Sequence, residues 1–277
     1  MIASRRRCNL KKRFATPYLL WMAIFVIVPI FMVIYFAFTD KSGAFTLDNI
    51  AKVGDYTDTF VESIWLGAVS TVICLLLGYP LALIIARTKK HIQGTLVMLC
   101  MMPMWMNFLL RTYAWMTLLE KNGLINRFLE FVGIGKVQMI NTDGAIILGM
   151  VYNFLPFMII PIYTVMQKTD HRLIEAAQDL GCSNFGVLRR VILPLSVPGI
   201  VSGITMVFVP AASTFIISKM LGGGKMMIGD IIEMQIIGGA NNLNLGAAIS
   251  LVLMVFVLIT MLFMNRFGDG ESEVGMI

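Results

Sequence analysis

The sequence predicts an all-α, polytopic membrane protein with six transmembrane helices. Of its 277 residues, 58% are hydrophobic and only 14% are charged, and the mean hydropathy is +0.82. This apolar fraction exceeds what the core of one soluble domain requires. Apolar runs of about 20 residues, the length that a helix needs to cross a bilayer, also recur along the chain.

The first span is expected over 17–38, after a basic tail at 1–16. Its apolar run is longer than that of a cleaved signal peptide and shows no clear cleavage site, so we expect the span to be retained. Proline lies inside five of the spans, where it permits the kinks that a gated path would use. Proline is also common in membrane helices generally, and both interpretations stay open. The further spans are expected over 64–86, 94–117, 144–166, 198–218 and 245–265.

The basic residues are divided unevenly between the two sides of the membrane. Fourteen of the 22 Lys and Arg residues fall in the tail, in the loops at 87–90 and 168–194, and at Arg266, against seven in the alternate loops. By the positive-inside rule, both termini and the 168–194 loop are cytoplasmic. The net charge of +6 therefore follows from topology and does not indicate binding of nucleic acid.

The loop at 168–194 is predicted to form a helix, a turn and a second helix. Asp170 can cap the first helix by accepting a bond from a backbone N–H group, and Gly181 supplies the left-handed conformation that ends it. Ser183 can cap the second helix, which Pro194 is expected to stop. The face that the first helix presents is small and apolar, and suits a groove on another protein better than lipid. It consists of Leu173, Ala176, Ala177 and Leu180.

The same loop resembles the EAA loop of ABC importer permeases, whose pattern is E-A-A, three residues, G, nine residues, I, one residue, L-P. Val191 stands where the family has isoleucine, and an ordinary amphipathic surface hairpin is the alternative interpretation. The matching positions are Glu175, Ala176, Ala177, Gly181, Leu193 and Pro194.

This resemblance implies a type I ABC importer permease fold that occupies 1–277 as a single transmembrane domain in the bacterial plasma (inner) membrane. It also implies that the loop couples the chain to a separate ATPase. The coupling residues would be Glu175, Ala176, Ala177, Leu180, Gly181 and Pro194.

No motif of enzyme chemistry is evident. The segment 221–227 contains Gly224 and Lys225 but has Met226 where a phosphate-binding loop needs Ser or Thr for magnesium, and no glycine stands five residues before Gly224. The four cysteines and two histidines lack metal-ligand spacing. We therefore expect no catalytic residue, metal or cofactor on this chain, with ATP and Mg²⁺ bound by a partner ATPase.

Six residues are candidates for the substrate path. Asp230 and Glu233 are three apart, which would place both carboxylates on one face of a short helix near the outer surface. Two carboxylates flanked by aromatic rings can attract and hold an oligocation. Alternatively, the rings form an interfacial belt and the acids are simply solvated. The candidates are Tyr113, Trp115, Glu120, Tyr152, Asp230 and Glu233.

From the second span onward the chain resembles spermidine/putrescine importer permeases, most clearly at 103–126, 150–163 and 218–235. The resemblance implies three kinds of partner: a second permease subunit of similar fold, an ATPase dimer and an extracytoplasmic substrate-binding protein. Lys219 departs from the family, which tends to have an acidic residue there, and would lower the attraction for a cation.

These observations favour an importer that moves polyamines into the cytoplasm by ATP-driven alternating access. The first helix of the 168–194 loop would move with the ATPase as a lever. A permease for another small solute or ion is the first alternative. A secondary transporter driven by an ion gradient fits less well, because no charge lies deep in any predicted span. A membrane scaffold that transports nothing is the third alternative.

Overall fold

A computed structural model describes residues 17, 18 and 20–269, and the predicted tail at 1–16 lies outside them. In this described part the regular structure is helical, apart from an isolated bridge between Thr39 and Phe45. Five helices are long and apolar enough to cross a membrane, and a bent helix pair makes a sixth span if it is counted as one. The all-α, polytopic fold class is thereby confirmed.

The described chain divides into two compact units. One comprises the residues up to Tyr56 together with Ile232–Val255, and the other comprises Thr57–Ile231 together with the residues from Phe256 onward. The second unit contains the loop at 168–194 and most of the candidate path residues.

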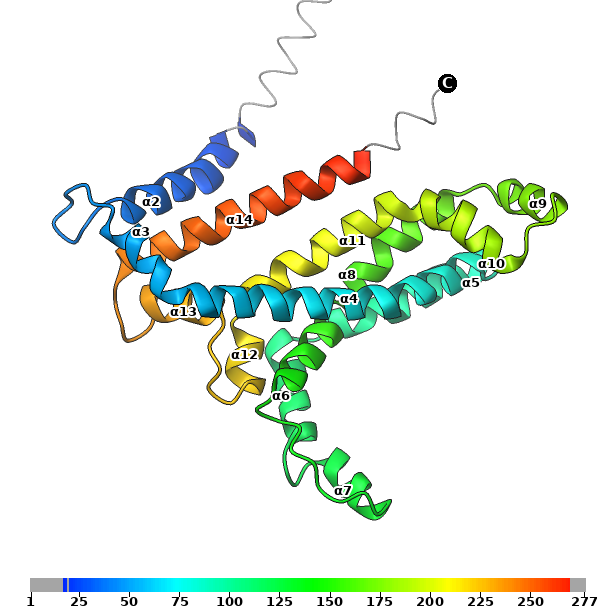
Figure 1. Ribbon diagram of the computed structural model, residues 1–277, viewed down its shortest axis with the longest axis horizontal. Coiled ribbons are helices and arrows are strands. Elements are labelled where there is room, and N and C mark those ends of the chain that lie inside the picture. The colour runs from blue at the N-terminus through cyan, green and yellow to red at the C-terminus, as the bar shows by residue number, and fades with distance from the viewer. Residues whose placement is uncertain (1–16, 19, 270–277) are drawn as a thin grey trace, which may run out of the picture. The chain divides into compact units, whose positions relative to one another are not determined.

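Three long helices form the core of the second unit: α4 (Thr57–Arg87), α8 (Asp143–Lys168) and α11 (Leu193–Ser213), drawn in cyan, green and yellow in Figure 1. They pack directly on one another because glycines let their backbones approach. A Cβ at Gly67 would lie 3.1 Å from the Ala212 nitrogen, and a Cβ at Gly199 would lie 2.9 Å from the Pro161 carbonyl oxygen. Small residues at such contacts are typical of membrane helices.

The third predicted span, 94–117, is not a straight helix. The chain forms α5 (Lys90–Met101) and a 3₁₀ turn, η3 (Met102–Trp105), and then bends by 85° before α6 (Phe108–Leu119) and the short α7 (Leu124–Phe131).

The bend in this pair has a local cause. Met106 is extended, with ψ 149°, and the Asn107 side chain caps α6 by accepting the Leu109 N–H at 2.8 Å. Pro103 in η3 adds to the break. A hydropathy run measures the length of an apolar segment and not its direction, so the run alone predicts one span.

The helix that corresponds to the fifth predicted span, 198–218, begins and ends earlier in the chain than the prediction. The helix begins earlier, because α10 (Asn184–Val187) continues through a π-helical turn, η4 (Leu188–Ile192), into α11. It also ends earlier, at Ser213, because Thr214 is extended. Two short helices follow, α12 (Ile216–Leu221) and α13 (Ile228–Ile236).

Pro194 does not stop a helix, and that prediction is wrong. Leu193 donates its N–H to the Leu188 carbonyl, five residues back, and Pro194 lies in the first turn of α11. An α-helix would press the proline ring against the carbonyl four residues back, and the wider π turn leaves room for it. The 184–213 stretch is therefore one continuous helix.

The first unit contains η1 (Ala23–Ile27), α2 (Val28–Ala37), α3 (Asp48–Val53), η2 (Gly54–Tyr56) and the first half of α14 (Leu243–Asp269). The Asn244 side chain joins its segments by donating to the carbonyls of Phe36, at 3.1 Å, and Thr39, at 2.6 Å. The predicted spans 17–38 and 245–265 correspond to η1 with α2 and to α14, as 64–86 and 144–166 correspond to α4 and α8.

Candidate functional site

The loop at 168–194 has the local structure that its sequence predicts. The Asp170 carboxylate accepts the Arg172 N–H at 3.0 Å and caps α9 (His171–Asp179). Gly181 adopts φ +81° and donates to the Gln178 carbonyl at 2.9 Å, while the next residue, Cys182, donates to the Ala177 carbonyl at 3.1 Å. This pair of bonds is a Schellman motif, which satisfies the last carbonyls of α9.

The second helix of the loop is capped as predicted. The Ser183 hydroxyl oxygen accepts the Gly186 N–H at 3.2 Å at the start of α10. Capping bonds at both helices and the Schellman motif between them give the loop a defined local structure.

The predicted apolar face of α9 is divided between two environments. Ala177 and its neighbour Ile174 pack against the core of the second unit. Ala176 is exposed, as are Leu173, 49% accessible, and Leu180, 86% accessible. Ala176 and Ala177 therefore point to different surroundings, which the helical spacing alone does not predict.

An open hollow is formed by the turn that follows α9, together with α10 and η4. Glu175 and Pro194, the other predicted coupling residues, are exposed on the same module. The hollow combines apolar side chains with two arginines, so it suits a partner that offers an apolar group beside an acid. Its lining includes Leu180, Gly181, Cys182, Phe185, Arg189 and Arg190.

Two of the predicted path residues meet in space. The rings of Trp115, on α6, and Tyr152, on α8, pack edge to face with their centroids 5.3 Å apart. Both side chains are partly buried. Tyr113, on the other side of α6, is 56% exposed and does not join this pair.

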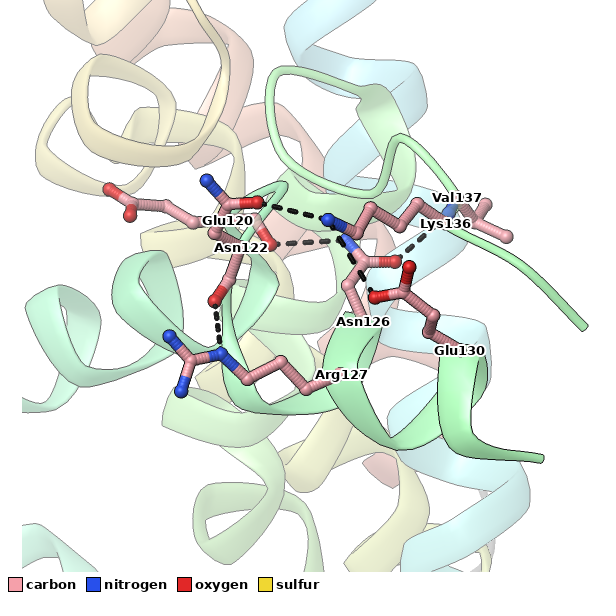
Figure 2. A network of polar contacts seen from close by, with 7 residues as sticks. All are labelled: Glu120, Asn122, Asn126, Arg127, Glu130, Lys136 and Val137. Carbon is pink, nitrogen blue, oxygen red and sulfur yellow. Dashed lines mark hydrogen bonds and ion pairs between the residues drawn. The ribbon is translucent and has the colours of Figure 1, made fainter. Parts of the chain in front are cut away.

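Glu120 ends α6 and belongs to a polar network around α7 (Figure 2). Its backbone carbonyl accepts the Asn126 side-chain N–H at 3.0 Å, and the Asn126 side-chain oxygen accepts the Val137 N–H at 2.9 Å. Asn126 is fully buried, so it anchors the segment after α6. The Glu120 carboxylate itself is exposed and points away from the network.

Asp230 lies in a different environment from the one its sequence suggests. It is only 7% exposed, and its carboxylate accepts the Ser218 hydroxyl at 2.5 Å and the Met227 N–H at 2.8 Å. It therefore holds α12 and the start of α13 together. Glu233 follows on the same helix, as predicted, but is partly exposed, so the two carboxylates do not share one environment.

An ion cluster appears that the sequence analysis missed. The Lys225 ammonium contacts the Glu62 and Asp143 carboxylates, each at 2.5 Å, and so links the loop after α12 to the second turn of α4 and the first turn of α8. Burial lowers the pKa of Lys225, but hydrogen bonds to Asp143 and Glu62 outweigh it, so the pKa is raised above its ordinary value. No local spacing signals this contact, because its members are far apart in the chain.

Two side-chain nitrogens of a buried arginine in the second unit have no hydrogen-bond partner. Arg111, on α6, is 7% exposed, and neither its Nε nor its Nη1 has a partner. Its guanidinium carbon lies 5.8 Å from the Phe108 ring centroid. Arg111 thus places a guanidinium at a packed position on α6.

The described part of the chain holds no group of three His, Cys, Asp or Glu side chains that could bind a metal ion. Cys74, one of the cysteines without metal-ligand spacing, is fully buried in the core of the second unit.

Comparison with known proteins shows a matching family, a similar permease and two similar solved structures. The model of the family described as binding-protein-dependent transport system inner membrane component matches residues 78–269. The spermidine/putrescine transport system permease protein PotB of Salmonella typhimurium (strain SL1344) is 34% identical over 267 residues, which cover 90% of this chain and 93% of that protein.

Among solved structures, a bacterial ABC transporter involved in the import of the acidic polysaccharide alginate gives a TM-score of 0.76, at 19% identity, over 96% of this chain and 97% of its own. A structure of bacterial alginate ABC transporter in complex with an alginate pentasaccharide-bound periplasmic protein gives a TM-score of 0.72, at 18% identity, over 95% of each chain.

Proposed function

Since the chain belongs to the family of binding-protein-dependent transport system inner membrane components, we propose that it is the subunit through which an ABC importer moves polyamines, spermidine or putrescine, into the cell. It is a multi-pass inner-membrane permease subunit and not the ATPase of the transporter. The proposal that the substrate is a polyamine rests on the 34% identity to a spermidine/putrescine permease across nearly the whole chain.

Energy would enter through the loop at 168–194. ATP and Mg²⁺ bind to a partner ATPase dimer, whose closure moves α9 as a lever and rocks α4, α8 and α11. The exposed Ala176 and Leu180 provide the small apolar contact, and Glu175 can pair with a basic group. Three further residues have a positioning role. The loop helix α9 is held by Ala177, which packs against the core, and by the turn at Gly181, and the first turn of α11 contains Pro194.

The remaining partners follow from the same proposal. A second permease subunit of similar fold completes the path, and an extracytoplasmic binding protein delivers the substrate, as the periplasmic protein bound to the related alginate transporter suggests. The excess of basic residues in the 87–90 and 168–194 loops favours a cytoplasmic position for both termini.

The path would offer ring faces and carboxylates to an oligocation. The packed pair of Trp115 and Tyr152 presents aromatic surface, and Tyr113 adds an exposed ring. Glu120 and Glu233 supply accessible acids. Asp230, which is buried against Ser218, would contribute only if α12 and α13 separate during the cycle.

A permease for another small solute is the second candidate, and one observation favours it. Arg111 is buried on α6, the helix that also carries the candidate path residues Tyr113 and Trp115, and a positive charge there disfavours a cation nearby.

The test is uptake of labelled spermidine by proteoliposomes that hold the chain with its partner permease, ATPase and binding protein. Uptake that requires ATP in the lumen is the expected result. Uptake by this chain alone, driven by an ion gradient without ATP, would instead make it a secondary transporter. ATP-dependent uptake of a different solute, with spermidine excluded, would favour the second candidate.

A further inference from the structure

A pocket of about 290 Å³ lies at the end of the second unit that carries the coupling loop. The turn between α4 and α5 forms one side of it, and the end of α8 forms another. Ile174 of α9 and Ile192 of η4 complete the wall. The volume is roughly ten times that of a water molecule in the liquid, which suits a small headgroup and not an oligomer.

The polar groups of this wall are largely engaged within the chain. The Gln93 side chain donates to the carbonyls of Ala86 and Thr88, each at 2.9 Å, and accepts bonds from Tyr163 and Gln167, each at 3.3 Å. The Thr88 hydroxyl donates to the Ile84 carbonyl at 2.8 Å. The wall is therefore preorganised, and its amides and hydroxyls offer few free donors to a ligand.

The groups left for a ligand are cationic. Arg87 and Lys90 line the pocket, are exposed and make no ion pair among the described residues, and no acidic residue lines the pocket. Lys90 also opens α5, whose first turn has neither a side-chain cap nor an acid. The positive end of that helix dipole adds to the two charges. The pocket thus attracts an anion and repels a polyamine.

The apolar part of the wall selects among anions. Leu83, Met166, Ile174 and Ile192 form a hydrophobic side next to the basic one, at the ends of the membrane-spanning helices α4 and α8. A ligand that matches carries a negative headgroup and an apolar portion, and meets the protein at the edge of the bilayer. Basic pockets between helices at the cytoplasmic side bind acidic lipid headgroups in this way.

We propose that this pocket binds the phosphate of an anionic phospholipid through Arg87 and Lys90. Its assignment to the cytoplasmic leaflet rests on the proposed orientation, whereas the pocket itself does not depend on the transported substrate. Because Ile174 belongs to the coupling helix, a bound lipid bridges the α4–α5 turn and the base of that helix.

The experiment counts phosphatidylglycerol molecules that remain on the detergent-purified complex of the full chain with its partners, by native mass spectrometry during titration with that lipid. Lys90→Gln and Arg87→Gln are each expected to weaken retention at one site about fivefold. Lys89→Gln is the matched control, because Lys89 is adjacent and carries the same charge but does not line the pocket. It should retain the lipid as the unmodified complex does.

Equal weakening by Lys89→Gln and Lys90→Gln would overturn the proposal, since it would indicate a diffuse surface charge. Unchanged retention in both pocket variants would do the same. Ala86→Leu, which narrows the pocket without altering charge, is expected to reduce retention as well.

A second arm separates lipid from soluble phosphate. Glycerol 3-phosphate and inorganic phosphate are expected to leave phosphatidylglycerol bound, because neither contacts the apolar wall. Displacement of the lipid by either at a similar concentration would assign the pocket to a soluble phosphate compound and contradict the lipid. None of these measurements requires spermidine. A negative result for lipid binding would therefore not contradict the proposed transport of polyamines.

Discussion

The backbone N–H of Cys182 donates to the carbonyl of Ala177 at 3.1 Å, and this bond closes α9. It depends on Gly181, whose φ of +81° turns the chain back toward α10. The turn holds Ala177 against the core while Ala176 faces outward. The end of α9 thus sets the direction in which the loop at 168–194 continues.

Gly181→Ala is expected to reduce substrate-stimulated ATP hydrolysis by the complex without preventing its assembly. A Cβ at this position meets nothing within 4 Å, so the cost is the left-handed backbone alone, about 1 kcal/mol. Gly94→Ala is the control, since that glycine is helical and its surroundings are equally open. An equal loss of stimulated hydrolysis in both variants would show that the turn has no special role.

Aspartate is expected to have different effects at Ala176 and at Ala177, on ATPase binding alone in the first case and also on stability in the second. The exposed Ala176→Asp is expected to release the ATPase during co-purification while leaving the thermal unfolding of the permease unchanged. Ala177→Asp buries a carboxylate against the core, at a cost of a few kcal/mol, and should lower the unfolding temperature as well. If Ala177→Asp left transport and assembly intact, the assignment of this loop to coupling would be wrong.

Asp230→Asn tests whether the buried carboxylate serves structure or substrate. Loss of a charged acceptor for Ser218 and Met227 is expected to destabilise the permease by about 1–3 kcal/mol. Ser218→Ala removes only the hydroxyl contact and keeps the charge of Asp230 and its bond from Met227. Thermal unfolding should fall in both variants, whereas a raised KM for spermidine uptake confined to Asp230→Asn would place that carboxylate in the path.

Lys225→Met should remove a pH-dependent stabilisation. The pKa of Lys225 is raised above its ordinary value of 10.5 in the folded chain, so its ion cluster stabilises fully below that value and weakens as the pH rises through the folded pKa. The unfolding temperature of Lys225→Met is therefore expected to lie below that of the unmodified protein at about pH 8, with the difference shrinking above about pH 10.5. The cluster is partly exposed, so the stabilisation is about 1 kcal/mol or less. A difference that grows with alkaline pH would contradict the ion pairing.

The sequence predicts local features of this chain well. The caps at Asp170 and Ser183 and the left-handed Gly181 each depend on one residue and its neighbours, and all three form as expected. Pro194 was misjudged because its effect depends on the hydrogen bonding of the preceding turn, which switches to the π pattern. The break at Asn107 carried a capping signal that the continuous apolar run concealed.

The candidate site was harder to predict, because its contacts join distant parts of the chain. The sequence places Asp230 on a short helix near the outer surface, and only the approach of α12 shows that its carboxylate accepts the Ser218 hydroxyl. The contact of Lys225 with Glu62 and Asp143 likewise has no periodic signature. The sequence analysis placed Trp115 and Tyr152 in the same candidate path. It did not predict that their rings pack edge to face.

The most direct test of the central claim is ATP hydrolysis by the complete transporter, reconstituted in lipid with its binding protein, with and without spermidine or putrescine. We predict that either polyamine raises hydrolysis in the unmodified complex and has no effect when Ala176→Asp is present. Hydrolysis that polyamines leave unchanged, but that another solute raises, would contradict the polyamine assignment.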